Sequence, residues 1–267
     1  VSSEQPENTR ATVLYYKDAE NLLVPVMRYI PKGDMGLAKA AIKGIIYSAE
    51  LAENIKPIGL LPTLPQGTKI NGAVIKDDGL AILDLSQEFL TFGRIDGKEI
   101  DEMPFGTKLG AALKRSEINL IKPEKIGDKL SKVMVYYQKK GSGYYSYFAP
   151  LTKLVSGYTN SAEAALNVLL EGPDSRTGLK NPFPKDTKLL GVEVNDGVAY
   201  VNFSEEILNM TSLAEERAIV KAVTLTLREF PSIKKVRLFV NGQTIENTES
   251  IGANEYLDVP VFVNFYE

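Results

Sequence analysis

Hydrophobic and polar residues follow two different periods along the second half of the chain. Short runs rich in β-branched and aromatic residues predict strands. These runs cover residues 132–137, 144–148, 188–194, 198–203 and 236–240. Between them, apolar residues recur every three or four positions, which predicts amphipathic helices that end at Leu170 and Phe230. The predicted order is strand, strand, helix, strand, strand, helix, strand, strand.

Turn and cap residues separate these elements. Asn160 with Glu163, and Ser212 with Glu215, have the spacing of a capping box at a helix start. Asp196-Gly197 lies between two apolar runs, which is a strong signal for a hairpin turn. Two helices, each placed between strands, predict an α+β fold in which both helices cover one face of a mainly antiparallel sheet.

The first half of the chain repeats the second. Three pairs of segments recur in the same order at offsets of 118 to 121 residues, namely Leu14–Lys17 with Val135–Gln138, Pro65–Lys69 with Pro184–Lys188, and Asp78–Glu88 with Asp196–Glu206. A repeat of about 120 residues indicates a domain duplication, because solenoid units run only about 20–50 residues. We therefore predict a polar tether at 1–10, a first domain at 11–121, a linker at 122–130 and a second domain at 131–267.

The first copy lacks part of the pattern. Asp96–Asp101 resembles Asn241–Glu246 at an offset of 145, so 27 residues of the second copy have no counterpart near Phe92–Arg94. Those residues would be the second helix and its following strand. Their loss would uncover a sheet face, at about 1.5–3 kcal/mol for each large apolar side chain left exposed. Either the first copy is degenerate or this sequence omits a segment. We favour the omission, which predicts a spatial break between Phe92 and Ile95.

Missing residue types narrow the possible chemistry. The chain has no Cys and no His, which excludes thiolate nucleophiles, imidazole bases and the usual zinc sites. A net charge of −3 provides no basic field for nucleic acid or anionic lipid. No apolar run approaches the ~20 residues that span a bilayer. Carboxylates, lysines and tyrosines remain as candidate functional groups.

The charged candidates have structural explanations. Glu205-Glu206 and Glu215-Glu216 could act as paired carboxylates on cell-wall glycan, but helix capping and the helix dipole explain the second pair. Lys234-Lys235 and Arg237 fit a solvated strand edge that discourages aggregation. The loop Asp174–Lys185 lacks the acid spacing of a calcium-binding loop. We predict no catalytic residue, no metal ligand and no cofactor.

Tyrosines are the remaining candidates. Tyr15-Tyr16, Tyr136-Tyr137 and Tyr144–Phe148 could form a stacking platform for sugar or peptide. Alternation along a strand directs half of them into the core, and exposed Tyr is common at protein interfaces. The sequence therefore favours core or interface roles, and it identifies no binding residue.

The second copy resembles a known domain family. The resemblance rests on AALNVLLEGP at Ala164–Pro173, LLGV at Leu189–Val192, DGVAYVNFS at Asp196–Ser204 and VTLTLREFP at Val223–Pro231. These segments resemble the GerMN domain over residues 130–246, with a weaker match over 11–105. Two tandem copies behind a polar leader are similar to the lipid-anchored sporulation and germination proteins of that family. Asn202 stands where the family often has Asp, as Asp84 does in the first copy.

The resemblance implies assembly and not catalysis. The family is similar in fold to ring-building domains of secretion machines, and it is associated with the channel complex between mother cell and forespore. It implies a non-enzymatic scaffold with protein partners in that complex, a homo-oligomeric ring, and no nucleic acid. It also implies an extracytoplasmic location between the two membranes, with an N-terminal lipid anchor that is absent from this chain.

Other interpretations remain open. The polar segment Val1–Arg10 is either a disordered terminus or a tether downstream of a removed signal or lipid-anchor segment. A binding module for cell-wall glycan or peptide is the main alternative function. A weak wall hydrolase that uses only carboxylates is a third, and it needs two carboxyl groups facing each other across a groove.

Overall fold

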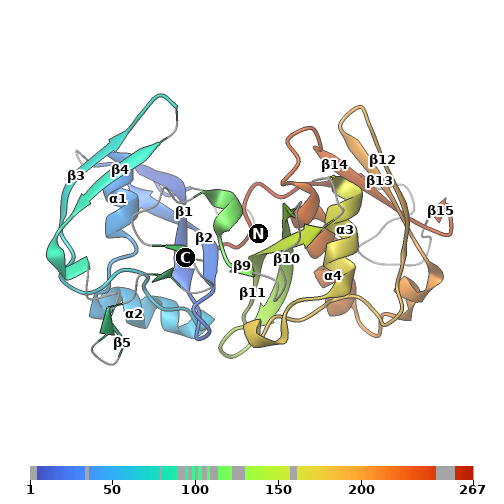
Figure 1. Ribbon diagram of the computed structural model, residues 1–267, viewed down its shortest axis with the longest axis horizontal. Coiled ribbons are helices and arrows are strands. Elements are labelled where there is room, and N and C mark those ends of the chain that lie inside the picture. The colour runs from blue at the N-terminus through green and yellow to red at the C-terminus, as the bar shows by residue number, and fades with distance from the viewer. Residues whose placement is uncertain are drawn as a thin grey trace. The chain divides into compact units, whose positions relative to one another are not determined.

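The computed structural model contains two compact units (Figure 1). Unit 1 comprises Val1–Ala111, Lys140–Tyr147 and Phe262–Glu267, and unit 2 comprises Ala112–Lys139 and Phe148–Val261. The structure describes residues 5–33, 36–78, 80–89, 94–95, 98–99, 102–103, 107–108, 114–121, 130–156, 161–244 and 256–266. The predicted division of the chain at residues 122–130 stays a prediction, because 122–129 lie outside the described residues.

Unit 2 has the element order that was predicted for the second copy. After a short 3₁₀ helix and strand, η3 (Arg115–Glu117) and β9 (Leu120–Ile121), two strands and a helix follow, β10 (Leu130–Lys140), β11 (Ser146–Ser156) and α3 (Ala162–Glu171). The rest consists of β12 (Leu189–Asn195), β13 (Val198–Phe203), α4 (Leu213–Leu227), β14 (Lys235–Val240), β15 (Gln243–Thr244) and β16 (Leu257–Asp258). The order from β10 to β15 and the α+β class are confirmed.

The helices of unit 2 contact two sheets. One sheet has the order β12-β13-β14-β15 with β16 also on β14, and the other has the order β10-β11-β9. Figure 1 shows α3 and α4 between β10–β11 and β12–β13. The backbone N–H of Tyr136 on β10 donates to the Thr226 hydroxyl on α4 at 3.2 Å. Strands β13 and β14 are parallel, because the intervening α4 carries the chain back across the sheet.

Turn chemistry in unit 2 agrees with the sequence. Asp196 and Gly197 have φ of 49° and 80°, and Asn241 and Gly242 have φ of 49° and 77°. Consecutive positive φ values suit the tight hairpin turns whose twist matches the flanking strands. The predicted Asp196-Gly197 turn is confirmed, and Asn241-Gly242 has the same geometry.

Helix starts are correct in part. Ser212 caps α4, and its hydroxyl accepts the Glu215 backbone N–H at 3.3 Å. The N-cap of α3 is Ser161, one residue after the predicted Asn160, because the Ser161 hydroxyl reaches the third amide of the helix. Helix α4 ends at Leu227 and not at Phe230. None of the described helices is both long enough and apolar enough to cross a bilayer.

Unit 1 is built mainly from hairpins. Its first elements are β1 (Thr9–Lys17), β2 (Leu23–Pro31), α1 (Leu37–Lys43), α2 (Ala49–Ile55), η1 (Lys56–Ile58), β3 (Ile70–Ile75) and β4 (Ala81–Leu85). Four two-residue strands follow, β5 (Arg94–Ile95), β6 (Lys98–Glu99), β7 (Glu102–Met103) and β8 (Thr107–Lys108). Within the described ranges, the strands pair as β1–β2, β3–β4, β5–β6 and β7–β8, all antiparallel.

Residues from distant parts of the chain complete unit 1. Asp18 is buried, and its carboxylate accepts the Leu22 N–H at 2.8 Å and the Tyr147 hydroxyl at 3.1 Å. Asn264 accepts the Met27 N–H at 2.8 Å and donates its side-chain amide to the Pro25 carbonyl at 2.8 Å. The β10–β11 hairpin tip and the last described residues are therefore structural parts of unit 1.

The repeat extends to single hydrogen bonds. In unit 1 the Ser86 hydroxyl accepts the Lys69 N–H at 2.9 Å, and in unit 2 the Ser204 hydroxyl accepts the Lys188 N–H at 2.9 Å. The register of each hairpin shifts near its start, between Ile70/Gly72 and between Leu189/Gly191. The offset of about 118 residues thus reflects the structural equivalence of the β3–β4 hairpin with the β12–β13 hairpin.

The second offset also has a structural counterpart. In unit 1, β5–β6 pairs Arg94 with Glu99 and Ile95 with Lys98. At an offset of 145, β14–β15 pairs Phe239 with Thr244 and Val240 with Gln243. The predicted spatial break between Phe92 and Ile95 falls on residues 92 and 93, which lie outside the described residues.

Candidate interaction surface

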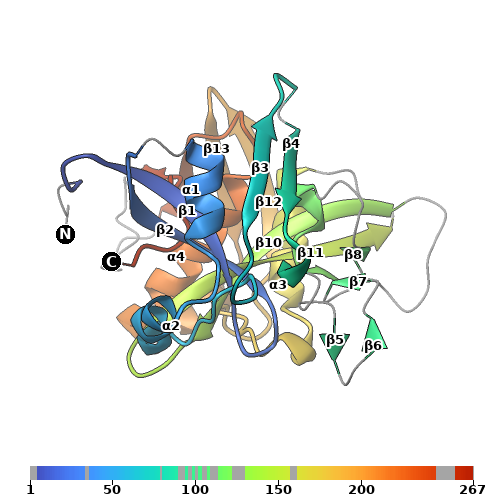
Figure 2. The ribbon, with the colours of Figure 1, turned by 90° about the vertical axis from the view of Figure 1, so that its left-hand side faces the viewer.

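The β3–β4 hairpin exposes apolar side chains on both of its faces. Figure 2 shows the hairpin as two long strands beside α1. Val74 and Ile82 are cross-strand partners on one face and are 59% and 47% exposed. Ile75 and Leu83 lie on the other face and are 58% and 39% exposed. These four residues, two on each face, form what we call the hairpin surface, and apolar side chains exposed together on one element make it a candidate site of contact.

The equivalent face is buried in unit 2. Val201 and Ala199, which correspond to Leu83 and Ala81, are completely inaccessible to solvent, whereas Leu83 and Ala81 are exposed. Helix α1 contacts β3 as α3 contacts β12, so the difference lies in β14, which pairs with β13, and in α4, which contacts β14. In the described part of unit 1 no such strand pairs with β4. The sequence predicted an uncovered sheet face in the first copy but did not identify these side chains as a contact surface. The sequence signal that could have identified them was the alignment of Leu83 with Val201.

One edge of β4 is open among the described residues. Strand β4 pairs with β3 alone, whereas β13 pairs with β12 on one edge and β14 on the other. The Leu80 carbonyl accepts the Lys76 N–H at 2.9 Å, so even-numbered positions of β4 direct their backbone groups toward β3. Strand alternation then directs the backbone groups of Ala81 and Leu83 to the open edge.

Acidic residues flank the open edge. Asp77 and Asp78 stand at the hairpin turn, and Asp84 stands near the end of β4. Asp78 accepts the Leu80 N–H at 2.9 Å, and Asp84 accepts the side-chain amide of Asn71 at 3.2 Å. The surface is therefore apolar along its length and acidic at both ends.

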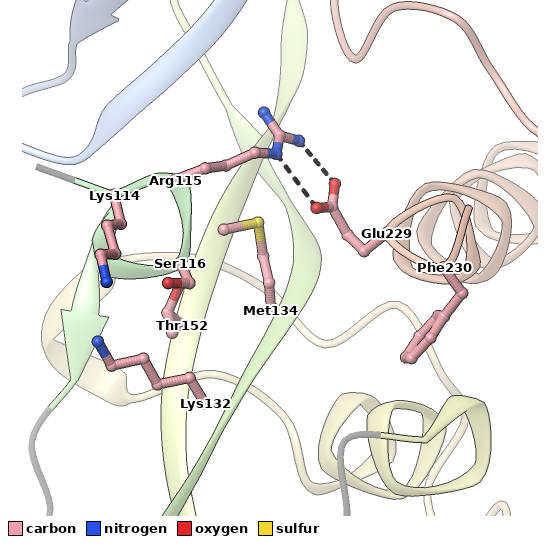
Figure 3. Close-up of a pocket in the computed structure, with 8 residues that line it drawn as sticks. All are labelled: Lys114, Arg115, Ser116, Lys132, Met134, Thr152, Glu229 and Phe230. Atoms are coloured by element: carbon pink, nitrogen blue, oxygen red, sulfur yellow. Dashed lines mark hydrogen bonds and ion pairs between the residues drawn. The ribbon is translucent and has the colours of Figure 1, made fainter. Parts of the chain in front are cut away.

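A cavity of about 340 Å³ lies elsewhere, in unit 2 (Figure 3). Its walls come from the 114–116 segment, β10, β11 and the end of α4. Arg115 and Glu229 form a two-pronged ion pair across it, with N–O distances of 2.6 and 3.2 Å. The Tyr136 hydroxyl donates to the same Glu229 carboxylate at 2.7 Å and accepts from Arg115 at 2.9 Å. Burial, with a contribution from Glu229, raises the pKa of Tyr136.

The second ion pair near this cavity joins Lys132 and Glu117, with an N–O distance of 2.6 Å. The hydrogen bond from Lys132 holds the pKa of the Glu117 carboxyl below its usual value. A carboxyl whose pKa is lowered in this way, as that of Glu117 is, is poorly suited to act as a general acid. The two ion pairs link the 114–121 segment to β10 and to the residues just after α4.

The predicted carboxylate pairs have separate local partners. Glu215 accepts from both the backbone N–H and the hydroxyl of Thr211, at 2.7 and 3.0 Å. Glu206 has a lowered pKa because of a hydrogen bond from Ser204. Glu205 lies 3.4 Å from the Asn241 amide, and Glu216 is buried on α4.

The sequence predicted that the basic cluster lies on a free strand edge. The structure shows that its strand is paired on both sides. Strand β14 pairs with β13 on one side and with β15 and β16 on the other. Lys235 pairs with Asp258 at 3.5 Å, and the Arg237 guanidinium lies over the rings of Phe239 and Tyr256. The edge explanation is wrong because the partner strand β16 comes from a distant part of the sequence.

The acidic side chain of the 174–185 loop has its hydrogen-bond and ion-pair partners within the loop. Asp174 accepts from the Arg176 backbone and forms a two-pronged ion pair with its guanidinium, at 2.9 and 2.7 Å. Across the part of the chain that the structure describes, no group of three or more acidic side chains is placed to hold a metal ion.

Most of the predicted tyrosine candidates lie in the core. Tyr16, Tyr136, Tyr137 and Tyr147 are buried, whereas Tyr144 is fully exposed. The Tyr137 hydroxyl donates to the Val168 and Leu169 carbonyls at the end of α3, at 2.9 and 3.1 Å. The structure therefore does not bring these rings together on the surface.

Comparisons with known proteins agree with this architecture. The Germane family model, described as sporulation and spore germination, matches residues 13–111 and 134–246. The spore germination protein GerM of Bacillus subtilis (strain 168) is 27% identical over 279 residues, which cover 91% of this chain and 74% of that protein. The solved tandem GerMN domains of the sporulation protein GerM from Bacillus subtilis match with a TM-score of 0.75 and 28% identity, over 97% of this chain and 100% of that chain. The predicted resemblance and the tandem architecture are confirmed.

Proposed function

Because this chain belongs to the Germane family, whose model covers both of its repeats, we propose that it acts in spore formation and germination as a non-enzymatic assembly protein. It works through protein–protein contacts, as the predicted scaffold role requires. The GerM relatives are described as a spore germination protein and as a sporulation protein, which gives the cellular process.

The hairpin surface is the observation that supports this role. Val74, Ile75 and Ile82 each leave about half of the side chain in water, and they belong to one hairpin. Burying a side chain of this size contributes about 1.5–3 kcal/mol, so a partner that covered several of them would gain substantial affinity. A catalytic role lacks comparable support, because the carboxylates of the unit 2 cavity are held in ion pairs.

The proposal includes a location and an assembly. The chain acts outside the cytoplasm, between the membranes of mother cell and forespore, held by a lipid anchor upstream of its first residue. There it contributes to the channel complex, either as a ring-forming subunit or as a scaffold for a ring.

Crosslinking in sporulating Bacillus subtilis tests the proposal. A tagged chain with its upstream anchor is expected to concentrate at the septum around the forespore and to crosslink to itself or to a channel component. The variant Ile82→Lys should reduce crosslinking, because it places a charge in the hairpin surface. Leu190→Lys is the matched control, since Leu190 is similarly exposed on unit 2. A chain that stays monomeric, uncrosslinked and evenly distributed would contradict the proposal.

A further inference from the structure

We propose that the open edge of β4 accepts an extended, basic segment of a partner protein as an added parallel strand. The segment would lie on β4 as β14 lies on β13 in unit 2. This inference rests on the proposed assembly function and specifies its contact, and it takes the missing counterpart of β14 to be absent from the protein itself, as in a degenerate first copy. Addition of a strand to an exposed sheet edge is a common mode of peptide recognition, in which backbone hydrogen bonds give affinity and side-chain pockets give specificity.

Unit 2 shows the backbone contacts that such a strand makes. The Gly197 carbonyl accepts the N–H groups of Lys234 and Lys235, at 2.8 and 3.1 Å. The register then runs in parallel from Val198–Lys235 to Phe203–Val240. At the far end, the Phe203 carbonyl accepts the Asn241 N–H at 2.9 Å.

Strand β4 presents the equivalent backbone groups of Ala81, Leu83 and Leu85 without a partner strand in the described part of the chain, whereas the counterpart of Gly197 lies outside the described residues. Its backbone follows the β13 pattern, with the bulge and the serine hydrogen bonds at equivalent positions. In unit 2 the Asn202 side chain accepts the Gly242 N–H at 2.9 Å, which fixes the turn after β14. Asp84 stands at the equivalent position, and a carboxylate accepts such an N–H at least as well as an amide does.

The partner strand needs alternating apolar residues. On β14 the residues Val236, Leu238 and Val240 are buried, and they alternate with the less buried Arg237 and Phe239. A strand of this pattern beside β4 would extend the hairpin surface into a three-stranded sheet. Three strands with an apolar face are more stable than an isolated hairpin, which is marginal in water.

Charge favours a basic partner over a second copy of this chain. Lys234 and Lys235, just before and at the start of β14, lie beside the Asp196 turn, and Asp78 stands at the equivalent turn in unit 1. If two copies of β4 paired edge to edge in antiparallel register, Asp78 would approach Asp84 of the other copy. A parallel pair would align Asp84 with itself. Like charges opposite each other destabilise a strand pair, so both arrangements are disfavoured.

A peptide of this chain's own β14 is the probe. Residues 234–242 (KKVRLFVNG) would be labelled and titrated with the full chain, with fluorescence anisotropy as the readout. We expect saturable binding that weakens with added salt. Leu83→Pro should weaken it about tenfold or more, because proline removes an outward N–H and about 1.4 kcal/mol corresponds to a tenfold change. The hairpin itself should survive, since that N–H does not point to β3.

Val194→Pro is the matched control. Strand β12 is the edge strand of the unit 2 sheet, and the backbone N–H of Val194 points away from β13 toward that edge. This variant should bind the peptide like the unchanged chain. If Leu83→Pro loses its circular dichroism signal, Asp77→Lys replaces it. That exposed reversal of charge should weaken binding of the basic peptide several-fold at low salt.

The inference would be overturned by absence of saturable binding, by equal binding of folded Leu83→Pro, or by loss of binding in Val194→Pro alone. A concentration-dependent dimer abolished by Leu83→Pro would also overturn it, because the occupant would then be a second copy. If the peptide fails to bind while the chain still crosslinks to a channel component in cells, the strand-addition inference is wrong and the proposed function stands.

Discussion

Tyr16 and Tyr137 occupy equivalent positions in the two repeats and make similar hydrogen bonds. The Tyr16 hydroxyl donates to the Gly44 carbonyl just after α1 at 3.2 Å. The Tyr137 hydroxyl donates to the Val168 and Leu169 carbonyls in the last turn of α3. Carbonyls at the end of a helix lack partners within the helix, so each hydroxyl supplies a donor to acceptors at a helix end.

Tyr137→Phe should therefore lower the free energy of unfolding by about 1–2 kcal/mol, because it removes the hydroxyl donor to the buried Val168 and Leu169 carbonyls, of which Leu169 keeps the Gly172 N–H at 3.2 Å. Urea denaturation followed by circular dichroism measures this difference. The control is Tyr144→Phe, which alters a fully exposed side chain and should leave the unfolding midpoint unchanged. Equal stability of the two variants would show that the Tyr137 hydrogen bonds contribute nothing.

Asp174 gives a prediction about pH. Its hydrogen bond with Arg176 lowers the pKa of the carboxyl to about 2. Because the folded-state pKa lies below the unfolded value of about 3.9, the charged carboxylate adds stability above pH 4, and this is lost as pH falls through about 2. The stability difference between the unchanged chain and Asp174→Asn should shrink from pH 5 to pH 2. Thermal melts across that range test it, and a difference independent of pH would refute it.

Helix starts show how local signals act on whole elements. Ser161 and Ser212 each accept an amide of the first turn, so each satisfies a donor that the helix leaves unpaired. For α4 the Glu215 carboxylate adds a bond to the Thr211 amide, one residue before the N-cap. Sequence reasoning found Ser212 but placed the α3 cap at Asn160, since both residues are good caps and only the backbone conformation distinguishes them.

Replacing these serines should cost stability in each helix. Ser161→Ala and Ser212→Ala are each expected to lower the free energy of unfolding by about 1 kcal/mol, whereas Thr or Asp at either position should restore most of it. Chemical denaturation of the single and restored variants gives the comparison. Asn160→Ala is the control for α3, and a larger loss there than in Ser161→Ala would contradict the assignment of the cap.

Unit 1 depends on residues far away in the sequence, and this is a property of the entire chain. Asn264 bonds to both Pro25 and Met27 of β2, and Tyr147 bonds to the buried Asp18. A truncation after Val261 should therefore increase hydrogen exchange in β1–β2 about tenfold or more, because local opening becomes easier. Exchange in β13–β14 should change little. An equal change of exchange in β1–β2 and in β13–β14 after truncation would be inconsistent with this role.

Local signals were sufficient for the order of elements. The Asp196-Gly197 turn, the strand at 198–203 and the helix from Leu213 were all predictable, because turn geometry and hydrophobic period depend on neighbouring residues. The duplication was equally visible, since equivalent residues such as Ser86 and Ser204 keep the same bonds. These features require no knowledge of distant contacts.

Burial required the tertiary structure. Leu83 and Val201 lie in matching sequences, yet one is exposed and the other inaccessible, because β13 also pairs with β14, which α4 contacts, whereas β4 has β3 as its one partner among the described strands. Lys235 was expected at an open edge, but β16 closes that edge. A side chain's solvent exposure depends on partners that can lie anywhere along the chain, so sequence determined the elements and tertiary packing determined which of their faces remain available for contact.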